Sequence, residues 1–375
     1  MIWMFWICAF LMVYVYVGYP VLARVLGRLL DRQVARAAVR PTVTVVVTAY
    51  NEQKGIKDKL DNLVALDYPA ELLDIIVASD ASSDDTDSIV RAYGDPRVSL
   101  LRVEGRQGKT QCQNQAVRAA RGEVVLFTDA TTEIDRGTLI AMVENFADPQ
   151  VGCVAGRLVY VDRESSLTGS GGTAYWEYEL SLRIAETQLG SLVGVSGCLY
   201  AVRRSAYREM SPSLISDFVI ALVMQEQRLR TVLEVNGICR EETLAKSRQE
   251  LGMRVRVAIR SITALVAKAN LLNPFRYGLF AWQLWSHKAL RYLSPVIWLL
   301  LLVANLSLLD QRLYQAALAA QLLVIGAGLA GWLLHSRQLA ALAKPYYFLL
   351  TNVASLVALL RYLRGDRVTV WRTVR

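Results

Sequence analysis

The chain has 375 residues, of which 54% are hydrophobic, and its formal net charge is +9 at pH 7. This hydrophobic content argues against a wholly soluble protein. No zinc-finger or RNA-recognition signature accompanies the basic charge, so we expect no nucleic-acid partner. Much of the basic excess lies beside apolar segments, where anionic membrane lipids explain it. The 5 cysteines are scattered without paired spacing and predict reduced thiols in the cytoplasm.

Residues 3–22 carry no charge and are long enough to cross the hydrocarbon core of a bilayer. A cleaved signal peptide is the alternative, but no basic region precedes the apolar run and no convincing cleavage site follows it. Arginines then recur every four residues, which predicts a basic stripe on one helix face formed by Arg24, Arg28, Arg32, Arg36 and Arg40. Because positive flanks stay in the cytoplasm, residues 1–40 are predicted to be an anchor with the middle of the chain inside.

Residues 41–251 have the composition of an α/β domain. Runs rich in β-branched residues predict strands at 43–48, 74–79, 97–102 and 123–128. The stretches between them predict helices at 52–66, 84–93 and 109–121. This alternation is typical of a mostly parallel sheet with helices on both faces, in which ligands bind beyond the carboxyl ends of the strands. Polar clusters follow the first, second and fourth strands, so the chemistry of the domain is expected there.

The three clusters are TAYNE (48–52), SDASSDDT (79–86) and TDATTE (128–133). Each alone has an ordinary explanation, because Asp and Ser are common in turns and at the starts of helices. Their side chains can also accept hydrogen bonds from a nucleobase or a ribose. The order of the clusters is more informative, since GKTQCQNQA (108–116) opens a helix between the second cluster and the third.

This succession resembles the inverting family 2 glycosyltransferases of the GT-A fold, over residues 43–256. The family pattern is A-Y-N-E, D-x-S-x-D-x-T, G-K-x-x-x-x-N and D-x-D. The resemblance implies a Rossmann-like cytosolic domain and a site that binds a nucleotide-sugar donor with Mg²⁺ or Mn²⁺. The implied donor residues are Ala49, Tyr50, Glu52, Asp80, Ser82, Asp84, Lys109 and Asp129. Asp129 is the implied metal ligand, and the alternative for Lys109 is a solvated surface lysine.

Two further segments extend the resemblance. GVSGCLYAVRR (194–204) is similar to the acceptor-pocket segment of the family, which implies that Ser196 and Gly197 lie beside the acceptor. LISDFVIAL (214–222) is similar to the element that ends in the catalytic base, which implies that Asp217 takes the proton of the acceptor hydroxyl. The alternative for Asp217 is a residue that begins a helix.

Upstream aromatic residues are candidates to stack on a sugar face, with packing inside a helix as the alternative. These residues are Tyr175, Trp176 and Tyr178, of which Trp176 is the candidate for the acceptor pocket.

The sequence departs from D-x-D, because Thr131 occupies the position of the second aspartate. A neutral threonine is a poorer ligand for a hard cation than a carboxylate. Since Mg²⁺ binds largely through substrate phosphates and one or two carboxylates, we expect Asp129 and the donor diphosphate to suffice. Thr131, Thr132 or Glu133 are candidates to contribute directly or through water.

A second departure concerns the Q-x-x-R-W element of polymer-making synthases. The chain has Met253 in place of the glutamine and Val257 in place of the tryptophan, while the arginine is kept as Arg256. Arg254 and Arg256 are expected to stabilise the leaving diphosphate. The missing aromatic residue favours a single sugar addition over processive synthesis.

Residues 252–290 predict amphipathic helices at the membrane surface. The predicted apolar face consists of Val255, Ile259, Ile262, Val266 and Ala269, and the basic face of Arg254, Arg260 and Lys268. A helix packed on the soluble domain is the alternative. His287 is expected to be a structural residue at the interface rather than a ligand or a base.

Residues 291–375 form the predicted C-terminal membrane region. Segments 293–309 and 313–334 are predicted to cross the membrane. If 345–360 also crossed, the basic tail would lie outside, against the positive-inside rule. That segment is therefore expected to be re-entrant or interfacial, with the tail in the cytoplasm. The basic residues of the tail are Arg361, Arg364, Arg367, Arg372 and Arg375.

The leading hypothesis is a multi-pass inner-membrane glycosyltransferase with its catalytic domain in the cytoplasm. It would move a sugar from a nucleotide-sugar, UDP-linked in preference to GDP-linked, to a lipid-linked or growing oligosaccharide. By resemblance, the pathway is exopolysaccharide or cell-envelope assembly. The alternatives are a processive polysaccharide synthase and a non-catalytic membrane scaffold that retained the fold. A transporter is disfavoured, because few ionisable residues lie inside the apolar segments.

Overall fold

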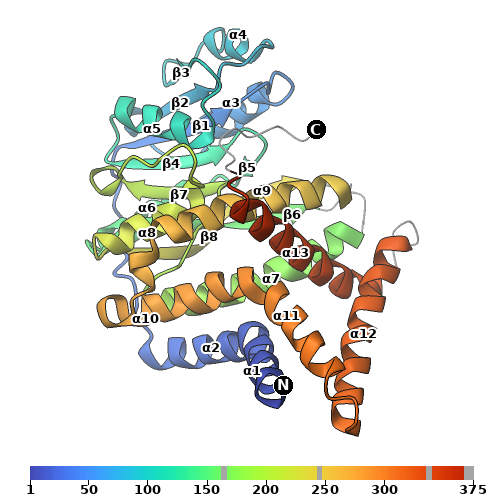
Figure 1. Cartoon of the computed structure of the whole chain (residues 1–375). Coiled ribbons are helices and arrows are strands. Elements are labelled where there is room, and N and C mark those ends of the chain that lie inside the picture. The colour runs from blue at the N-terminus through green and yellow to red at the C-terminus, as the bar shows by residue number, and fades with distance from the viewer. Residues whose placement is uncertain (162–166, 243–246, 335–339, 367–375) are drawn as a thin grey trace. The chain divides into compact units, whose positions relative to one another are not determined.

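The computed structural model describes residues 1–161, 167–242, 247–334 and 340–366, with the side chains of 167–175, 242, 247–249 and 340 outside that description. The chain divides into two compact units, and Figure 1 labels the helices and strands of both. The helical unit comprises Met1–Leu29, Asp162–Ala185 and Thr243–Arg367. The sheet unit comprises Leu30–Val161, Glu186–Glu242 and Val368–Arg375.

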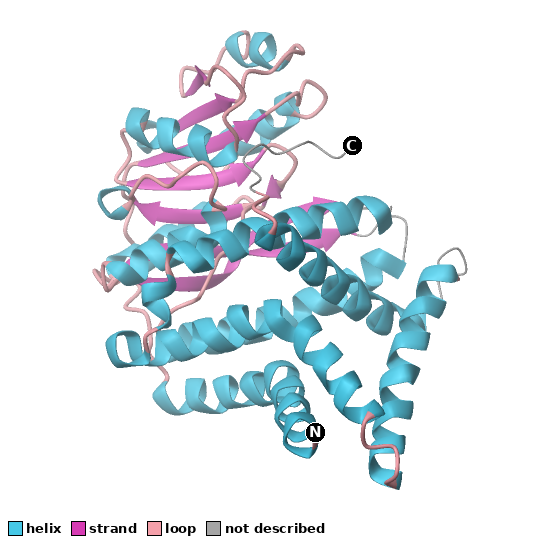
Figure 2. Cartoon of the chain, viewed as in Figure 1, coloured by secondary structure: helices cyan, strands magenta, loops and turns pink. Residues whose placement is uncertain are grey.

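The sheet unit is built on one 8-stranded sheet with the order β3-β2-β1-β4-β7-β6-β8-β5 (Figure 2). Its strands are β1 Val43–Ala49, β2 Leu73–Ser79, β3 Val98–Arg102, β4 Val124–Asp129, β5 Glu133–Ile134, β6 Val151–Val161, β7 Leu199–Arg203 and β8 Arg230–Glu242. The pairs β1–β2, β2–β3, β1–β4 and β6–β8 are parallel, whereas β4–β7, β6–β7 and β5–β8 are antiparallel. The predicted α/β fold with a mostly parallel sheet is confirmed, and its four predicted strands are β1 to β4.

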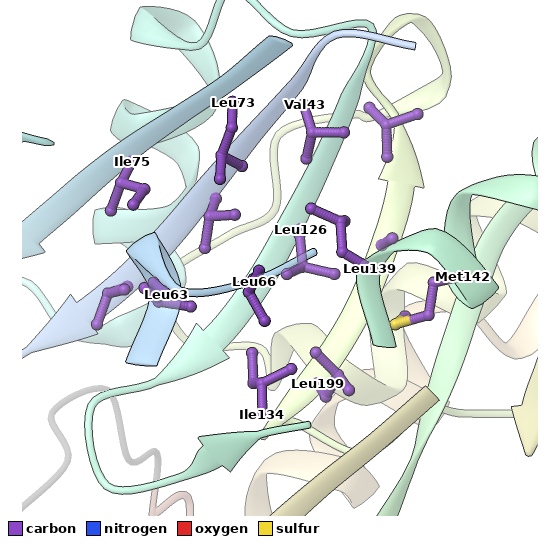
Figure 3. Packing of buried hydrophobic residues seen from close by; sticks show 14 of the residues in the cluster. Val43, Leu63, Leu66, Leu73, Ile75, Leu126, Ile134, Leu139, Met142 and Leu199 are labelled. Carbon is purple, nitrogen blue, oxygen red and sulfur yellow. The ribbon is translucent and has the colours of Figure 1, made fainter. Parts of the chain in front are cut away.

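Helices pack on this sheet through buried apolar side chains. They are α3 Ile56–Val64, α4 Thr86–Arg91, α5 Lys109–Ala119, α6 Thr138–Val143 and α8 Ser216–Glu226, with short 3₁₀ turns at Ala70–Leu72, Glu144–Ala147 and Arg204–Ala206. Leu63 of α3 and Leu139 of α6 pack with Val43 and Leu126 of the strands (Figure 3). Right-handed crossovers place α3 and α4 on that face and α5 on the other. Full burial of one such side chain stabilises the fold by about 1.5–3 kcal/mol.

The strand register gathers the three polar clusters at one edge of the sheet. In the parallel pairs, Ala49 of β1 lies beside Ser79 of β2, and Thr48 lies beside Asp129 of β4. The chain segments that leave these three strands therefore start side by side. Antiparallel β7 begins at the same edge, where Leu199 pairs with Thr128.

The arginines that follow the N-terminal segment do not form one helix face. Helix α2, Tyr19–Leu30, ends before Asp31, which has a φ of 34°. Beyond it, Arg36 pairs with Glu234 at 3.0 Å and Arg40 with Glu144 at 3.4 Å, both within the sheet unit. The predicted stripe is wrong after Arg28, because ion pairs with the α/β domain hold the later arginines in a non-helical segment.

The helical unit contains α1 and α2 at the N-terminus and a series of helices after residue 247. Its elements are α1 Ile2–Val13, a π-helical turn Tyr14–Gly18, α2, α7 Leu167–Leu189 (residues from 186 belong to the sheet unit), α9 Ser247–Ala267, a 3₁₀ turn Ala269–Leu272, α10 Pro274–Leu284, a π-helical turn Trp285–Ala289, α11 Leu290–Leu306, α12 Arg312–Leu333 and α13 Ala340–Leu363. Among the described residues, 4 helical segments are long and apolar enough to cross a membrane, namely Ile2–Leu30, Pro274–Leu306, Arg312–Leu333 and Ala341–Leu363. The predicted N- and C-terminal membrane helices are confirmed.

The last of these segments differs from the expectation for 345–360. A re-entrant segment has to reverse direction, whereas α13 is a single helix that contains Pro345. The re-entrant form is therefore wrong, and α13 is long enough to span. The tail residues Arg367, Arg372 and Arg375 lie outside the described residues.

Helix α9 forms where an amphipathic helix was predicted, but its predicted apolar and basic faces are confirmed only in part. Val255, Ile259 and Ile262 are buried as predicted, whereas Val266 is exposed. Arg260, expected on the polar face, is buried, so that part of the predicted polar face is wrong. His287 lies 3.0 Å from Glu179 and is buried, which fits the expected structural role.

Candidate active site

The loops after β1 and β2 are locked together by hydrogen bonds from backbone amides. The Gln53 amide donates to Asp84 Oδ2 at 3.1 Å, and the Glu52 amide donates to Thr86 Oγ1 at 2.8 Å. Asp84 also accepts from the Thr86 amide at 3.0 Å. Partial burial opposes ionisation of Asp84, but the hydrogen bonds from Thr86 and Gln53 outweigh it and lower the pKa of this carboxyl. The loops after β1 and β2 thus form one unit, the double loop, which contains the predicted donor residues Glu52 and Asp84.

Tyr50, Asn51 and Ser82 complete this double loop. Asn51 has a φ of 54°, in the left-handed region that asparagine tolerates, and its amide donates to Ser82 Oγ at 3.2 Å. The guanidinium of Arg106 lies over the ring of Tyr50, 3.3 Å from its centre. The predicted donor residues Tyr50 and Ser82 are therefore held next to the loop that precedes α5.

Asp80 holds that loop in place. Its side chain is fully buried and accepts from the amides of Gln107 at 2.7 Å and Gly108 at 3.1 Å. Gly108 has a φ of 90°, a conformation that favours glycine. Because both amides bind Asp80, the start of α5 is fixed at the edge of the sheet where β1 and β2 end.

Lys109, the first residue of α5, connects this loop to the ends of β4 and β7. Its Nζ is paired with Asp129 Oδ1 and donates to the carbonyl oxygen of Gly197 at 3.0 Å. Burial opposes the charge of Lys109, but Asp129 and Asp217 outweigh it and raise the pKa of the ammonium. Lys109 is therefore bound to protein groups and is not the solvated surface lysine of the alternative interpretation.

The carboxylate of Asp217 lies against Gly197. A Cβ atom placed on Gly197 would be 2.7 Å from Asp217 Oδ2, so only a glycine leaves room for the carboxylate. Asp217 is in the first turn of α8, and its carbonyl accepts from the Val195 amide at 3.0 Å. The structure thus brings together four residues predicted from separate motifs, Lys109, Asp129, Gly197 and Asp217.

Lys59 is a residue of this region that the motifs did not indicate. It lies in α3, its exposed fraction is 3%, and Nζ donates to the carbonyl oxygen of Thr132 at 2.6 Å and to Thr128 Oγ1 at 3.0 Å. Burial lowers its pKa to about 8, although nearby acidic groups oppose that shift. The signal was present, because Lys59 falls among Ile56, Leu60 and Leu63 on the apolar face of the predicted helix.

The residues that follow Asp129 have distinct environments. Thr132 is buried, and its hydroxyl donates to the Asp129 carbonyl oxygen at 3.1 Å. Its hydroxyl therefore closes the turn rather than pointing to solvent. Thr131 and Glu133 are exposed, and Glu133 lies in β5 opposite Arg240.

Ser196 is buried, with its Oγ 3.1 Å from Cys198 Sγ. All cysteines of the chain are described, and all are free and buried.

The other predicted site residues belong to the helical unit. Arg254 donates to Glu250 Oε1 at 2.7 Å and lies 4.4 Å from the ring centre of Tyr347. Burial lowers the pKa of Arg256. The ring of Trp176 lies 5.2 Å from the guanidinium of Arg183. The side chain of Tyr175 lies outside the described residues.

A divalent cation fits this site only with help from a ligand. Across the described part of the chain, no group of 3 or more His, Cys, Asp and Glu residues lies close enough to hold a metal ion. Asp129 offers one carboxylate, 29% exposed, at the edge where the double loop and α5 meet. One carboxylate with the phosphate oxygens of a donor matches how Mg²⁺ is commonly bound.

Residues 44–211 match the family model described as Glycosyl transferase family 2. The chain is 29% identical over 167 residues to a poly-beta-1,6-N-acetyl-D-glucosamine synthase of Staphylococcus aureus. The aligned region covers 44% of this chain and 40% of that protein. It is 30% identical over 171 residues to an N-acetylglucosaminyltransferase of Azorhizobium caulinodans, with 44% and 43% covered. The matches thus span about two fifths of the length of these curated relatives.

A solved structure is similar over almost the whole chain. It is a mannosyltransferase from Pyrobaculum calidifontis in complex with GDP-Man and Mn²⁺, with a TM-score of 0.72, 26% identity, and 97% of this chain and 99% of that chain covered. The family match falls on the part of the chain that holds the double loop, Lys109, Asp129 and Gly197. The chain therefore carries a family 2 glycosyltransferase domain of the GT-A fold, and the resemblance inferred from its motifs is confirmed.

Proposed function

We propose that this protein is a membrane-anchored inverting glycosyltransferase that transfers a sugar from a nucleotide-sugar donor to a lipid-linked or growing oligosaccharide. The observation that carries the proposal is the contact between Asp217 and Gly197 beside the Lys109–Asp129 ion pair. A carboxylate able to accept a proton thus lies next to a carboxylate and an ammonium able to bind a cation and a diphosphate.

In the proposed reaction, Asp217 is the general base. Its carboxylate takes the proton from the acceptor hydroxyl while that oxygen forms a bond to the anomeric carbon of the donor sugar. The bond between that carbon and the diphosphate oxygen breaks on the opposite side, and the nucleoside diphosphate leaves with the electron pair. A single displacement of this kind inverts the anomeric configuration, and it requires one base and a stabilised leaving group.

The leaving group is proposed to be stabilised at Asp129 and Lys109. Asp129 would hold a divalent cation together with the diphosphate oxygens, and that cation would offset the negative charge that develops on the leaving group. The ammonium of Lys109 is paired with Asp129 and can donate to a phosphate oxygen. Arg254 and Arg256 are further proposed donors to the diphosphate.

The mannosyltransferase complex supports both a nucleotide-sugar donor and a divalent cation. It was solved with GDP-Man and Mn²⁺, so GDP-mannose belongs among the first donors to test beside the UDP-sugars that we predict. The sugar itself is selected by a few pocket contacts, which no short motif records.

The proposed location is the inner membrane, with the catalytic domain in the cytoplasm. The 4 candidate spans support attachment to a membrane, and the arginines Arg24 and Arg28 lie at the end of the first span, as the positive-inside rule expects. A role in exopolysaccharide or cell-envelope synthesis is supported by the similarity to the S. aureus poly-beta-1,6-N-acetyl-D-glucosamine synthase.

The test uses the full chain purified in detergent. We expect release of nucleoside diphosphate from one of a panel of UDP- and GDP-sugars in Mn²⁺ or Mg²⁺, and loss of that release in Asp217→Asn. Because the substitution removes a charge but preserves shape, nucleotide binding should be retained. Absence of turnover and of UDP and GDP binding in the wild type would refute a transferase and favour the scaffold alternative.

Processive synthesis is the second candidate, because the S. aureus relative is named as a polysaccharide synthase. Val257 in place of the tryptophan of the polymer-making element argues for single addition. Chromatography of the products separates the two, since a processive enzyme makes long chains while most acceptors remain unused.

A further inference from the structure

The turn after β4 is closed by its own side chains. The Thr132 hydroxyl donates to the Asp129 carbonyl oxygen at 3.1 Å and lies 3.1 Å from Thr128 Oγ1. The Thr132 amide is 3.5 Å from the same carbonyl oxygen. The conformation of this turn decides the direction of the Asp129 carboxylate, because Asp129 is its first residue.

The ammonium of Lys59 binds this turn from the interior of the domain. Its acceptors are the Thr132 carbonyl oxygen at 2.6 Å, Thr128 Oγ1 at 3.0 Å and Thr132 Oγ1 at 3.4 Å. An ammonium has three donors, and all three acceptors belong to the residues that flank Asp129. Lys59 therefore connects α3 to the end of β4 and to the turn that follows it.

The packing of α3 does not by itself require a lysine at this position. Ile56, Leu60 and Leu63 are fully buried on the same helix and supply its apolar contacts with the sheet. Removing a charge from water is unfavourable. The ammonium of Lys59 is buried nonetheless, and its hydrogen bonds go to the end of β4 and to one turn of the donor site.

We propose that Lys59 is a positioning residue of the donor site: it holds the Asp129–Thr132 turn so that the carboxylate of Asp129 is directed at the cation and the donor diphosphate. This inference rests on the proposed function.

The threonine at the second D-x-D position makes that direction more important. With Thr131 in place of a carboxylate, Asp129 is the acidic ligand on which the motif relies. A binding group has to be held within about 0.5 Å and 10–20° of its productive geometry. An error in the orientation of Asp129 cannot be corrected by a second carboxylate in the motif, so the turn has to be fixed from behind.

The test compares Lys59→Met with Lys57→Met in the full chain. Methionine has a similar length and removes the three hydrogen bonds. Lys57 lies two residues away in α3, its side chain is 68% exposed and it pairs with Asp61, so its substitution controls for the loss of one lysine. The measurements are the thermal unfolding midpoint and the affinities for GDP and UDP by calorimetry, with Mn²⁺ and with EDTA.

We expect Lys59→Met to remain folded, with a lower unfolding midpoint because the buried Thr132 carbonyl oxygen loses the Lys59 donor, and to bind the preferred nucleotide at least 10-fold more weakly in Mn²⁺. The ratio of the affinity in Mn²⁺ to that in EDTA should fall, because the lost contact acts through the metal ligand. Lys57→Met should behave like the wild type in both measurements.

Three results would overturn the inference. One is nucleotide affinity in Mn²⁺ within a factor of three of the wild type. Another is an equal loss of affinity in Mn²⁺ and in EDTA, which would show an effect of charge rather than of positioning. The third concerns Thr132→Val, which keeps the backbone acceptor and removes the hydroxyl that closes the turn, and which remains informative if Lys59→Met does not fold. Unchanged Mn²⁺-dependent binding in Thr132→Val would refute the role of the turn.

These results are distinct from failure of the proposed function. If the wild type binds neither nucleotide in Mn²⁺, the donor site itself is refuted, and the inference fails with it. If the wild type binds and both lysine variants bind equally well, only the role of Lys59 is refuted.

Discussion

Gly197→Ala is expected to disturb catalysis more than folding. The added methyl group would lie 2.7 Å from Asp217 Oδ2, whereas an ordinary contact begins at 3.4 Å, so the oxygen has to move by about 0.7 Å. The same methyl would lie 3.5 Å from both Cβ and Cγ of Asp217, so the clash is confined to the end of the side chain. Gly197 is not among the glycines with positive φ, and alanine is therefore compatible with its backbone.

The expected loss follows from the displacement of the base. A misplacement of about 1 Å in a catalytic group can cost about 100-fold in rate, so we expect kcat to fall by about 10- to 100-fold. That range corresponds to about 1.4–2.7 kcal/mol in activation free energy. Nucleotide affinity and the unfolding midpoint should change little, because the movement is local to Asp217.

The assay measures kcat for nucleoside diphosphate release together with nucleotide affinity. Gly137→Ala is the matched control, because a Cβ there meets no atom within 4 Å. In an Asp217→Asn background, Gly197→Ala should cause little further loss, since both changes act on the same group. Wild-type kcat in Gly197→Ala would refute the assignment of Asp217 as the base in this geometry.

Three further predictions concern other parts of the sheet unit. Asp84→Ala should destabilise the fold by about 1–2 kcal/mol at neutral pH in urea unfolding. The pKa of Asp84 is lower in the folded state, so this stabilisation is present above the unfolded-state pKa of about 3.9 and is lost as the pH falls through the folded-state pKa. If the variant and the wild type lost stability equally in acid, the hydrogen bonds of Asp84 would be refuted as its source. Arg36→Met should cost about 1–2 kcal/mol by the same measurement, because it removes a partner of Glu234, which is 2% exposed; an unchanged free energy of unfolding would contradict this. Calorimetry with Mn²⁺ alone should show no tight binding, since the described residues contain no group of 3 potential ligands, and nucleotide should restore it; tight binding without nucleotide would show that the protein alone holds the metal.

The strands around the donor site were predictable because their residues satisfy local and global requirements together. Residues 43–48 and 123–128 are β-branched and apolar runs that suit a buried parallel sheet, and they form β1 and β4. The polar clusters after them were predicted to converge because parallel strands end at the same edge. Strands β6 and β8 were not predicted individually, since their pairing depends on residues far apart in the chain.

The predictions from the sequence were wrong where contacts between distant parts of the chain determine the position of a side chain. The period of four among Arg24 to Arg40 fits a helix, but Arg36 and Arg40 find acidic partners on residues more than a hundred positions away. Helical periodicity placed Arg260 on a polar face, but its side chain is buried. Lys59 was overlooked because its acceptors, Thr128 and Thr132, meet α3 only in the folded domain.

The roles of the site residues could be predicted from the sequence to different degrees. Lys109, Asp129 and Asp217 carry chemistry in motifs of fixed order, and the structure places them together. Asp80 is a predicted donor residue, and its carboxylate also binds backbone amides of the loop before α5, which the motif did not indicate. A motif shows which residues recur in a family, whereas the division between contact and scaffolding depends on hydrogen bonds that only the fold defines.

If Asp129 holds a divalent cation as proposed, its ion pair with Lys109 makes the lysine a competitor for that cation. A cation that binds Asp129 has to exchange with the ammonium, and the free energy of that exchange is subtracted from its affinity. A diphosphate offers the displaced ammonium a new anionic partner and so removes the penalty. By thermodynamic linkage, the donor and the cation should then strengthen each other's binding by the same factor. The resting site would thereby keep its charges balanced until both ligands arrive.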